Sequence, residues 1–146
     1  MTATNHTITG VLIGLTVHQP VLAIVLAVLS HFVLDAIPHY SDPVLVGKKL
    51  APVLAIDASV ALLVLGGLVV LQPQSWLLAV VCGIAAASPD LMWFPLWVRD
   101  VLGKPKKSLN IVQRFHSKIQ WAEKPYNYPF EIVWFLGSLF LLVKVA

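Results

Sequence analysis

The sequence predicts an all-α integral membrane protein that folds as one domain, because the chain is too apolar for a soluble domain. Hydrophobic residues make up 58% of the 146 positions and charged residues only 12%, and the mean hydropathy is +0.84. The apolar residues form continuous runs without alternation, which favours helices over strands in a bilayer. We therefore expect a compact bundle of four to five transmembrane helices over residues 1–146. The single cysteine, Cys82, excludes an intrachain disulfide and is expected to be a small buried apolar residue.

The chain divides into five apolar segments, separated by turns that contain proline or basic residues. The segments are residues 8–17, 21–37, 52–71, 76–98 and 130–145. A spanning helix needs about 20 residues, so the first segment is short enough to be only partly inserted. This segment contains Gly10 and Gly14, whose spacing allows another helix to approach closely. The fourth segment is interrupted at Ser88-Pro89-Asp90 and again at Pro95.

Lys and Arg are concentrated in two of the loops, and this asymmetry predicts an orientation. Lys48 and Lys49 lie in the loop before the third segment, and seven further basic residues lie in the loop 99–127. The turns at residues 18–20 and 72–74 contain none. The positive-inside rule therefore places both basic loops and the N-terminus in the cytoplasm. This topology explains the net charge of +3 without a nucleic-acid partner.

The basic loop also contains a segment, residues 109–121, with helical apolar periodicity. Its pattern predicts an amphipathic helix at the membrane interface. This helix would carry His116 together with Arg114 and Lys118, which lie four residues apart. The two cations are suited to binding an anionic headgroup or a phosphate on a substrate.

The most informative polar pattern is His31, Asp35 and His39, spaced four residues apart in an apolar segment. On a helix, successive members of this stripe are separated by roughly 6 Å of rise. Two imidazoles flanking a carboxylate are typical metal ligands. His31 and His39 are roughly 12 Å apart in rise, too far to share one ion. If both bind metal, two ions are expected, and otherwise one. Pro38 could bend the helix end and bring His39 inward.

Three aspartates lie inside apolar segments, where an uncompensated carboxylate costs several kcal/mol. No Lys or Arg lies deep in these segments, so histidines and a divalent cation are the expected partners. Zinc suits such a mixed set best, with manganese or iron if more oxygen ligands join. Plainer roles are hydrogen bonds between helices, proton transfer, or helix capping after Pro89. The predicted metal ligands, all in the cytoplasmic half, are His6, His31, Asp35, His39, Asp57 and Asp90.

Several short motifs resemble those of the YdjM-like membrane-bound metal-dependent hydrolases. They are Asn5-His6-x-x-x-Gly10, Ser30-His31-x-x-x-Asp35, Pro89-Asp90 and Arg114-Phe115-His116-Ser117. The resemblance implies an inner-membrane hydrolase of bacteria or archaea whose His and Asp residues hold a divalent metal. The chain departs from the family pattern at Met92, where a second Asp usually stands, and in the order of its motifs.

The preferred functional hypothesis is a metal-dependent hydrolase acting on a membrane lipid, or on another amphipathic ester or phosphoester, at the cytoplasmic leaflet. Asp57 or Asp90 would act as general base, and His116, Arg114 or Lys118 would contact the scissile group. The alternatives are a transporter of protons or divalent metals, a haem-binding bundle, and a non-catalytic membrane scaffold. The sequence gives neither the substrate nor the oligomeric state.

Overall fold

The computed structural model describes residues 1–42, 44–105 and 107–146, and every regular element in these ranges is helical. The all-α class predicted from composition is thus confirmed. In chain order the elements are α1 (Ala3–Thr16), α2 (Pro20–Ala36), η1 (Gly47–Lys49), α3 (Ala51–Leu71), α4 (Trp76–Ala87), η2 (Ser88–Trp93), α5 (Phe94–Val101), α6 (Ile111–Ile119), η3 (Gln120–Ala122), η4 (Pro125–Asn127) and α7 (Tyr128–Val145).

Three helical segments of the described chain are long and apolar enough to cross a membrane. They are Gly47–Leu71, Trp76–Val101 and Pro125–Val145. Helix α2 is apolar but shorter, with 17 residues, and α1 has 14. The chain is therefore a helical protein with three candidate spans, fewer by length than the four to five expected.

Prolines set several of the helix boundaries. Helix α2 starts at Pro20, where the missing N–H costs nothing, and the Gln19 side chain accepts a hydrogen bond from the Leu22 N–H. It ends at Ala36, shortly before Pro38. The interruption expected in the fourth segment is present, since η2 separates α4 from α5 beginning at Ser88-Pro89. This break turns Asp90 out of the regular α-helical path.

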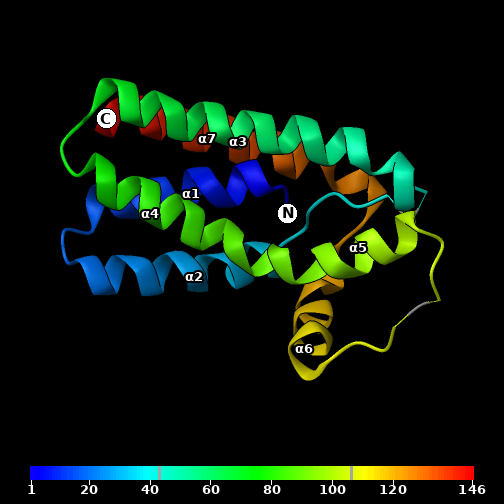
Figure 1. The fold of residues 1–146 in the computed structure, drawn as a ribbon. Coiled ribbons are helices and arrows are strands. Elements are labelled where there is room, and N and C mark those ends of the chain that lie inside the picture. Colours follow the sequence, from blue (N-terminus) through cyan, green and yellow to red (C-terminus); the bar gives the residue numbers. More distant parts are fainter. Residues whose placement is uncertain (43, 106) are drawn as a thin grey trace.

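Helix α1 lies at the centre of the bundle, with α2, α3, α4 and α7 packed around it (Figure 1). Its residues are mostly buried, in contrast to those of α3, where only Ala61 and Leu68 are buried. The first turn of α1 carries His6 into the middle of the molecule. A short helix surrounded by others exposes little surface to the bilayer, which explains how it can be shorter than a span.

Two glycines allow α1 and α4 to pack at backbone distance. A Cβ added to Gly14 would lie 2.5 Å from Ala79 Cα, and one added to Gly10 would lie 2.7 Å from Ala86 Cβ. Cys82 is fully buried in the same contact, as expected of a small apolar residue. The close approach expected from the Gly10-x-x-x-Gly14 spacing is therefore present.

Helix α6 turns a polar face inward. Its buried residues are Gln113 and His116, whereas Ile111 is 83% and Phe115 58% exposed. Asn110 caps the helix, because its side chain accepts from the Gln113 N–H while the Gln113 side chain accepts from the Asn110 N–H. A helix is thus present in this loop, with a polar inward face and an outward face that carries Ile111 and Phe115 together with the exposed Arg114 and Lys118.

Candidate metal centre

Four ionisable side chains from three separate elements meet in the interior. His31 and Asp35 come from α2, Asp90 from η2 and His116 from α6. Each offers one ligand atom, and these atoms all lie within 4.8 Å of one another. His31, Asp35 and His116 are fully buried, and the Asp90 side chain is 31% exposed. The group therefore forms a buried cluster that could hold a metal ion and that opens outward only at Asp90.

His31 is oriented by a hydrogen bond on the far side of its ring. Its Nδ1–H donates to the Ala86 carbonyl oxygen at 2.8 Å, which leaves a lone pair on Nε2. Nε2 lies 3.3 Å from Asp35 Oδ2 and 3.6 Å from Asp90 Oδ1. Metal-binding histidines usually donate their second ring N–H to a carbonyl or carboxylate in this manner. His31 therefore presents its free nitrogen to both carboxylates.

Asp35 is surrounded by nitrogen atoms. Its Oδ1 accepts from the Met1 nitrogen at 2.6 Å, and its Oδ2 accepts from His116 Nε2 at 2.7 Å and from Gln120 Nε2 at 3.2 Å. His6 Nε2 lies 3.1 Å from Oδ1. A fully buried carboxylate is tolerated when such partners replace its hydration.

His116 is held on both sides of its ring. The Trp93 indole N–H donates to His116 Nδ1 at 3.2 Å, so the proton of the neutral ring is on Nε2. That Nε2–H points at Asp35 Oδ2 and lies 3.1 Å from His31 Nε2. In this arrangement His116 is a hydrogen-bond donor to the cluster, unlike His31.

His6 lies beside the cluster. Its ring stacks on His31 with 4.0 Å between centroids. Both of its ring nitrogens are buried and lack a hydrogen-bond partner among the described residues, because the contact with Asp35 does not have hydrogen-bond geometry. An unpaired buried imidazole is costly unless a ligand completes it.

The donor set fits a divalent cation. A tetrahedral zinc site with bonds near 2.0–2.1 Å separates its ligand atoms by about 3.4 Å. The distances from His31 Nε2 are 3.1 Å to His116, 3.3 Å to Asp35 and 3.6 Å to Asp90, which bracket this value. Nitrogen and carboxylate oxygen are also the ligand types of zinc, manganese and iron sites.

His39, predicted to be a ligand, lies outside the group of four. It follows α2 and pairs in an isolated bridge with Glu123. Its Nδ1–H donates to the Ile37 carbonyl oxygen at 2.8 Å, and its buried Nε2 has no partner among the described residues.

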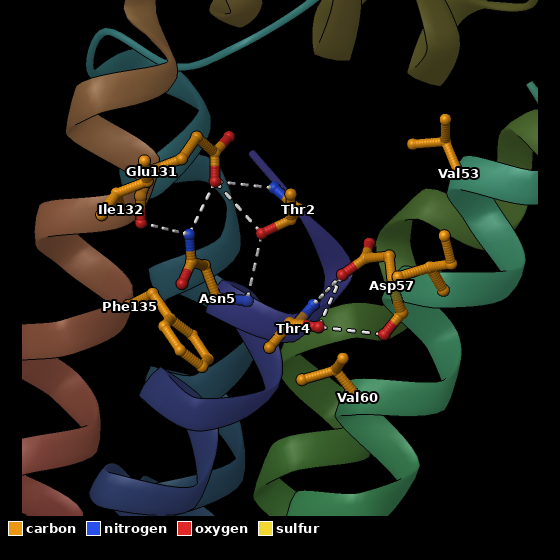
Figure 2. A pocket seen from close by; sticks show the side chains of 10 residues that line it. Thr2, Thr4, Asn5, Val53, Asp57, Val60, Glu131, Ile132 and Phe135 are labelled. Atoms are coloured by element: carbon orange, nitrogen blue, oxygen red, sulfur yellow. Dashed lines mark hydrogen bonds between the residues drawn. The ribbon is translucent and has the colours of Figure 1, made fainter.

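Asp57 lies at the N-terminus of α1, on the far side of that helix from the cluster. Its Oδ2 accepts from the Ala3 N–H at 2.7 Å, and its Oδ1 accepts from the Thr4 N–H at 3.0 Å and from the Thr4 hydroxyl (Figure 2). These are the N–H groups that a helix leaves without internal partners. The Asp57 oxygens are thus used by α1.

Glu131, which the sequence did not single out, holds the other side of the same turn. Its Oε2 accepts from the Asn5 amide at 2.6 Å and from the Thr2 hydroxyl at 3.1 Å (Figure 2). A cavity of about 390 Å³ lies between the two carboxylates, lined by residues of α3 and α7 and by the start of α1. Glu131 lies inside the apolar segment 130–145, so it too is an ionisable side chain in an apolar run.

Arg114 and Lys118, predicted to contact substrate, are both exposed on α6. Arg114 Nε–H donates to the Leu109 carbonyl oxygen at 3.0 Å. Neither residue belongs to the group of four. Trp93 and Gln120 do touch the cluster, but a tryptophan and a glutamine in or near apolar segments give no signal of such a role.

Fold and site together define a helical protein with candidate membrane spans and a buried His/Asp group suited to a metal ion. Comparisons of the chain with models of protein families, with curated proteins and with solved structures find no match. The resemblance to the YdjM-like family therefore stays a hypothesis that rests on the short motifs.

Proposed function

We propose that this protein is a membrane metal-dependent hydrolase that acts on a lipid, or on another amphipathic ester or phosphoester. The observation that carries the proposal is the convergence of His31, Asp35, Asp90 and His116 from distant parts of the chain into one buried group. Burying four ionisable side chains is expensive in a bilayer, and such groups usually mark functional sites. The same residues belong to the motifs shared with the YdjM-like family, which supports the same reaction class.

The proposed metal site uses His31 Nε2 and both carboxylates, with His116 as fourth ligand and His6 beside Asp35. Zinc is the preferred ion, with manganese or iron as the alternatives, because the donors are nitrogen and carboxylate oxygen. Ligation by His116 Nε2 requires its proton to be on Nδ1, opposite the Trp93 N–H. His39 and Asp57 are not part of this proposed set.

Two carboxylates in the cluster differ in their access to water, and this suggests different roles. Asp35 is fully buried and held in place by hydrogen bonds, so it would be the carboxylate that anchors the ion. Asp90 is partly exposed and forms the mouth of the cluster, so it would accept the proton of the attacking water. A bound divalent ion would activate that water and stabilise charge developing on a phosphoryl or carbonyl oxygen.

The orientation we propose follows from the distribution of basic residues. The loops with most Lys and Arg adjoin η1, α5 and α6, at the end of the molecule away from the turns at residues 18–20 and 72–74 (Figure 1). The positive-inside rule puts this end in the cytoplasm. The outward face of α6, with Ile111 and Phe115, would then lie in the interface of the cytoplasmic leaflet, and α2 would cross as a fourth span.

Metal content of the purified protein tests the first half of the proposal. We expect one equivalent or more of a divalent metal in the wild type and a loss of most of it in His31→Ala and Asp35→Asn. His18→Ala is the matched control, because His18 is an exposed histidine in the turn after α1. A wild type without metal, or equal metal in His31→Ala and His18→Ala, would overturn the metal site.

Lipid turnover tests the second half. The protein is placed in vesicles of mixed phospholipids, and the products are measured by mass spectrometry with metal, with chelator, and with metal restored. Turnover should require metal and fall at least a hundredfold in Asp90→Asn, which loses the proton acceptor. Metal flux across the vesicle without lipid products would contradict hydrolysis and favour the transport alternative.

A further inference from the structure

A second cavity lies beside the start of α6. It has a volume of about 500 Å³, within the range of about 300–1,000 Å³ typical of small-molecule sites. Its wall combines residues of η2 and α5, the following loop and the start of α6. The lining residues are Met92, Pro95, Leu96, Arg99, Lys107, Ser108, Asn110 and Gln113.

The polar part of this lining is cationic. Arg99 and Lys107 both face the cavity, and none of its lining residues is a carboxylate. Arg99 is held in place because its Nη2–H donates to the Pro105 carbonyl oxygen at 3.0 Å. Its Nε–H is buried and has no acceptor among the described residues. A buried guanidinium N–H without a partner is stabilised by an anionic oxygen, which Arg binds through two parallel hydrogen bonds.

The start of α6 adds to the positive potential of the cavity. Asn110 and Gln113, which form the cap of this helix, are both in the lining. The N-terminal end of a helix carries a partial positive charge that favours anions. The Ser108 hydroxyl supplies a further donor. Cations, hydroxyl and helix end together favour a tetrahedral oxyanion such as a phosphoryl group.

Another part of the lining is apolar. Met92, Pro95 and Leu96 line it, on the segment that runs from η2 into α5. A ligand that fills this cavity therefore needs an anionic end and a hydrophobic part. A phosphorylated amphiphile has both.

The cavity is directly connected to the metal-centre residues. Gln113 lines it, and its amide donates to the Met92 carbonyl oxygen at 3.0 Å, which ties α6 to η2. The next residue, Trp93, donates to His116. Gln113 and His116 are three residues apart on α6, a rise of about 4.5 Å. The hydrogen bonds of Gln113 to Met92 and of Trp93 to His116 thus join the wall of the cavity to the cluster.

We propose that this cavity binds the phosphoryl group of the substrate, with Arg99 and Lys107 as its principal ligands. This inference rests on the proposed hydrolase function, which it narrows to phosphorylated substrates. It assigns substrate binding to residues other than the exposed Arg114 and Lys118.

Equilibrium binding in detergent micelles tests the inference without turnover. The two probes are dihexanoyl phosphatidic acid and inorganic phosphate, titrated into metal-free protein at fixed ionic strength. Arg99→Gln and Lys107→Gln should each weaken binding about tenfold. Lys104→Gln is the matched control, since Lys104 is an exposed cation in the same loop outside the lining, and its affinity should equal that of the wild type.

The two probes distinguish the sources of the phosphoryl group. Tighter binding of the lipid assigns a membrane substrate that uses the apolar wall, and equal binding of both assigns a soluble phosphate compound. Wild-type affinity in Arg99→Gln, or equal losses in Arg99→Gln and Lys104→Gln, would overturn the inference. Lys107 is an exposed loop residue, so Lys107→Gln keeps the test valid if Arg99→Gln does not fold.

Metal content separates failure of this inference from failure of the hydrolase proposal. Arg99→Gln should retain the wild-type amount of metal, because Arg99 is not in the cluster. Phosphate binding by a wild type that takes up no divalent metal when metal is supplied would overturn only the hydrolase. Wild-type phosphate affinity in Arg99→Gln, with the wild-type metal content retained, would overturn only the phosphoryl site.

Discussion

The proton position on each histidine ring decides how that residue can take part in the centre. His31 donates from Nδ1 to Ala86 and offers its Nε2 lone pair, so it can ligate without rearrangement. His116 accepts from Trp93 at Nδ1 and donates from Nε2 to Asp35, so it must change tautomer before it can ligate through Nε2. In that tautomer two N–H groups, of Trp93 and of His116, would face each other.

Removing the Trp93 donor should therefore strengthen metal binding. Trp93→Phe keeps most of the ring but relieves the conflict, and we expect zinc to bind about tenfold tighter, ~1.4 kcal/mol. Trp97→Phe is the control, because the Trp97 indole also donates a buried bond, to the Gly47 carbonyl oxygen, but outside the cluster. Competition titration with a chromogenic chelator measures both. Weaker binding in Trp93→Phe alone would show that His116 does not ligate through Nε2.

Most members of the cluster could be predicted at the residue scale, because an ionisable side chain in an apolar segment needs a partner. That argument identified His31, Asp35 and Asp90, whereas His116, in the basic loop, was predicted to contact the scissile group and not to be a ligand. The same argument could not distinguish these cluster members from Asp57. Asp57 is paired with the backbone N–H groups of Ala3 and Thr4, and such pairing cannot be read from the residue types in a sequence. Glu131 was missed although it lies in an apolar segment, and its partners include the Asn5 amide and the Thr2 hydroxyl.

At the scale of the helix, Asp57 and Glu131 fix the start of α1. Two negative charges near a helix N-terminus satisfy its free N–H groups and interact favourably with its dipole. Helix α1 carries His6 only one turn after this point. By fixing where α1 starts, the two carboxylates on α3 and α7 thereby position His6 next to Asp35.

Asp57 should consequently behave as a positioning residue for α1. Asp57→Ala should lower the free energy of unfolding by about 2 kcal/mol, and Asp57→Asn by about half of that, since the amide oxygen still accepts one bond. Folded Asp57→Asn should keep the wild-type metal content. Asp100→Asn is the control, because Asp100 is exposed and its substitution also removes one carboxylate. Metal loss from folded Asp57→Asn would instead make Asp57 a ligand, as the sequence predicted.

The different role of Asp57 follows from where α1 begins. The apolar run starts at Ile8, so the sequence predicted a helix from that residue, with polar Thr2, Thr4 and Asn5 ahead of it. The helix instead starts at Ala3, after Thr2, whose hydroxyl accepts from the Asn5 N–H. The polar first turn is buried because α3 and α7 supply carboxylates for it, a tertiary effect that hydropathy does not contain.

The close packing of α1 against α4 predicts that a glycine-to-alanine substitution has opposite effects on stability at two helical positions. Replacing glycine by alanine within a helix is normally stabilising by up to about 1 kcal/mol. We expect this at Gly66, where a Cβ would meet nothing within 4 Å. Gly10→Ala should be destabilising, because its Cβ would press on the α4 backbone and on Ala86. Unfolding in mixed micelles monitored by circular dichroism compares the two; stabilisation at both positions would mean that the helices separate easily.

At the scale of the whole molecule, the class of fold was predictable and the number of spans was not. Composition predicted a helical membrane bundle, and the large exposed apolar side chains of α3, such as Leu63 and Val70 at 75% and 82%, are consistent with it. Helices α1 and α2 are close to the minimum span length, so packing around α1, and not hydropathy, decides how deeply each is inserted. The orientation depends on charges in the loops and is open to direct measurement.

Labelling with a membrane-impermeant maleimide tests the orientation in intact cells. The wild type should not react, because its single cysteine, Cys82, is fully buried. Gln74→Cys, in the exposed turn between α3 and α4, should react from outside, and Lys104→Cys, in the basic loop, only after the cells are opened. Both variants change exposed residues, so each should fold as the wild type does. The reverse pattern would place Asp90 and the cationic cavity at the outer leaflet, and the substrate would then have to be drawn from that leaflet.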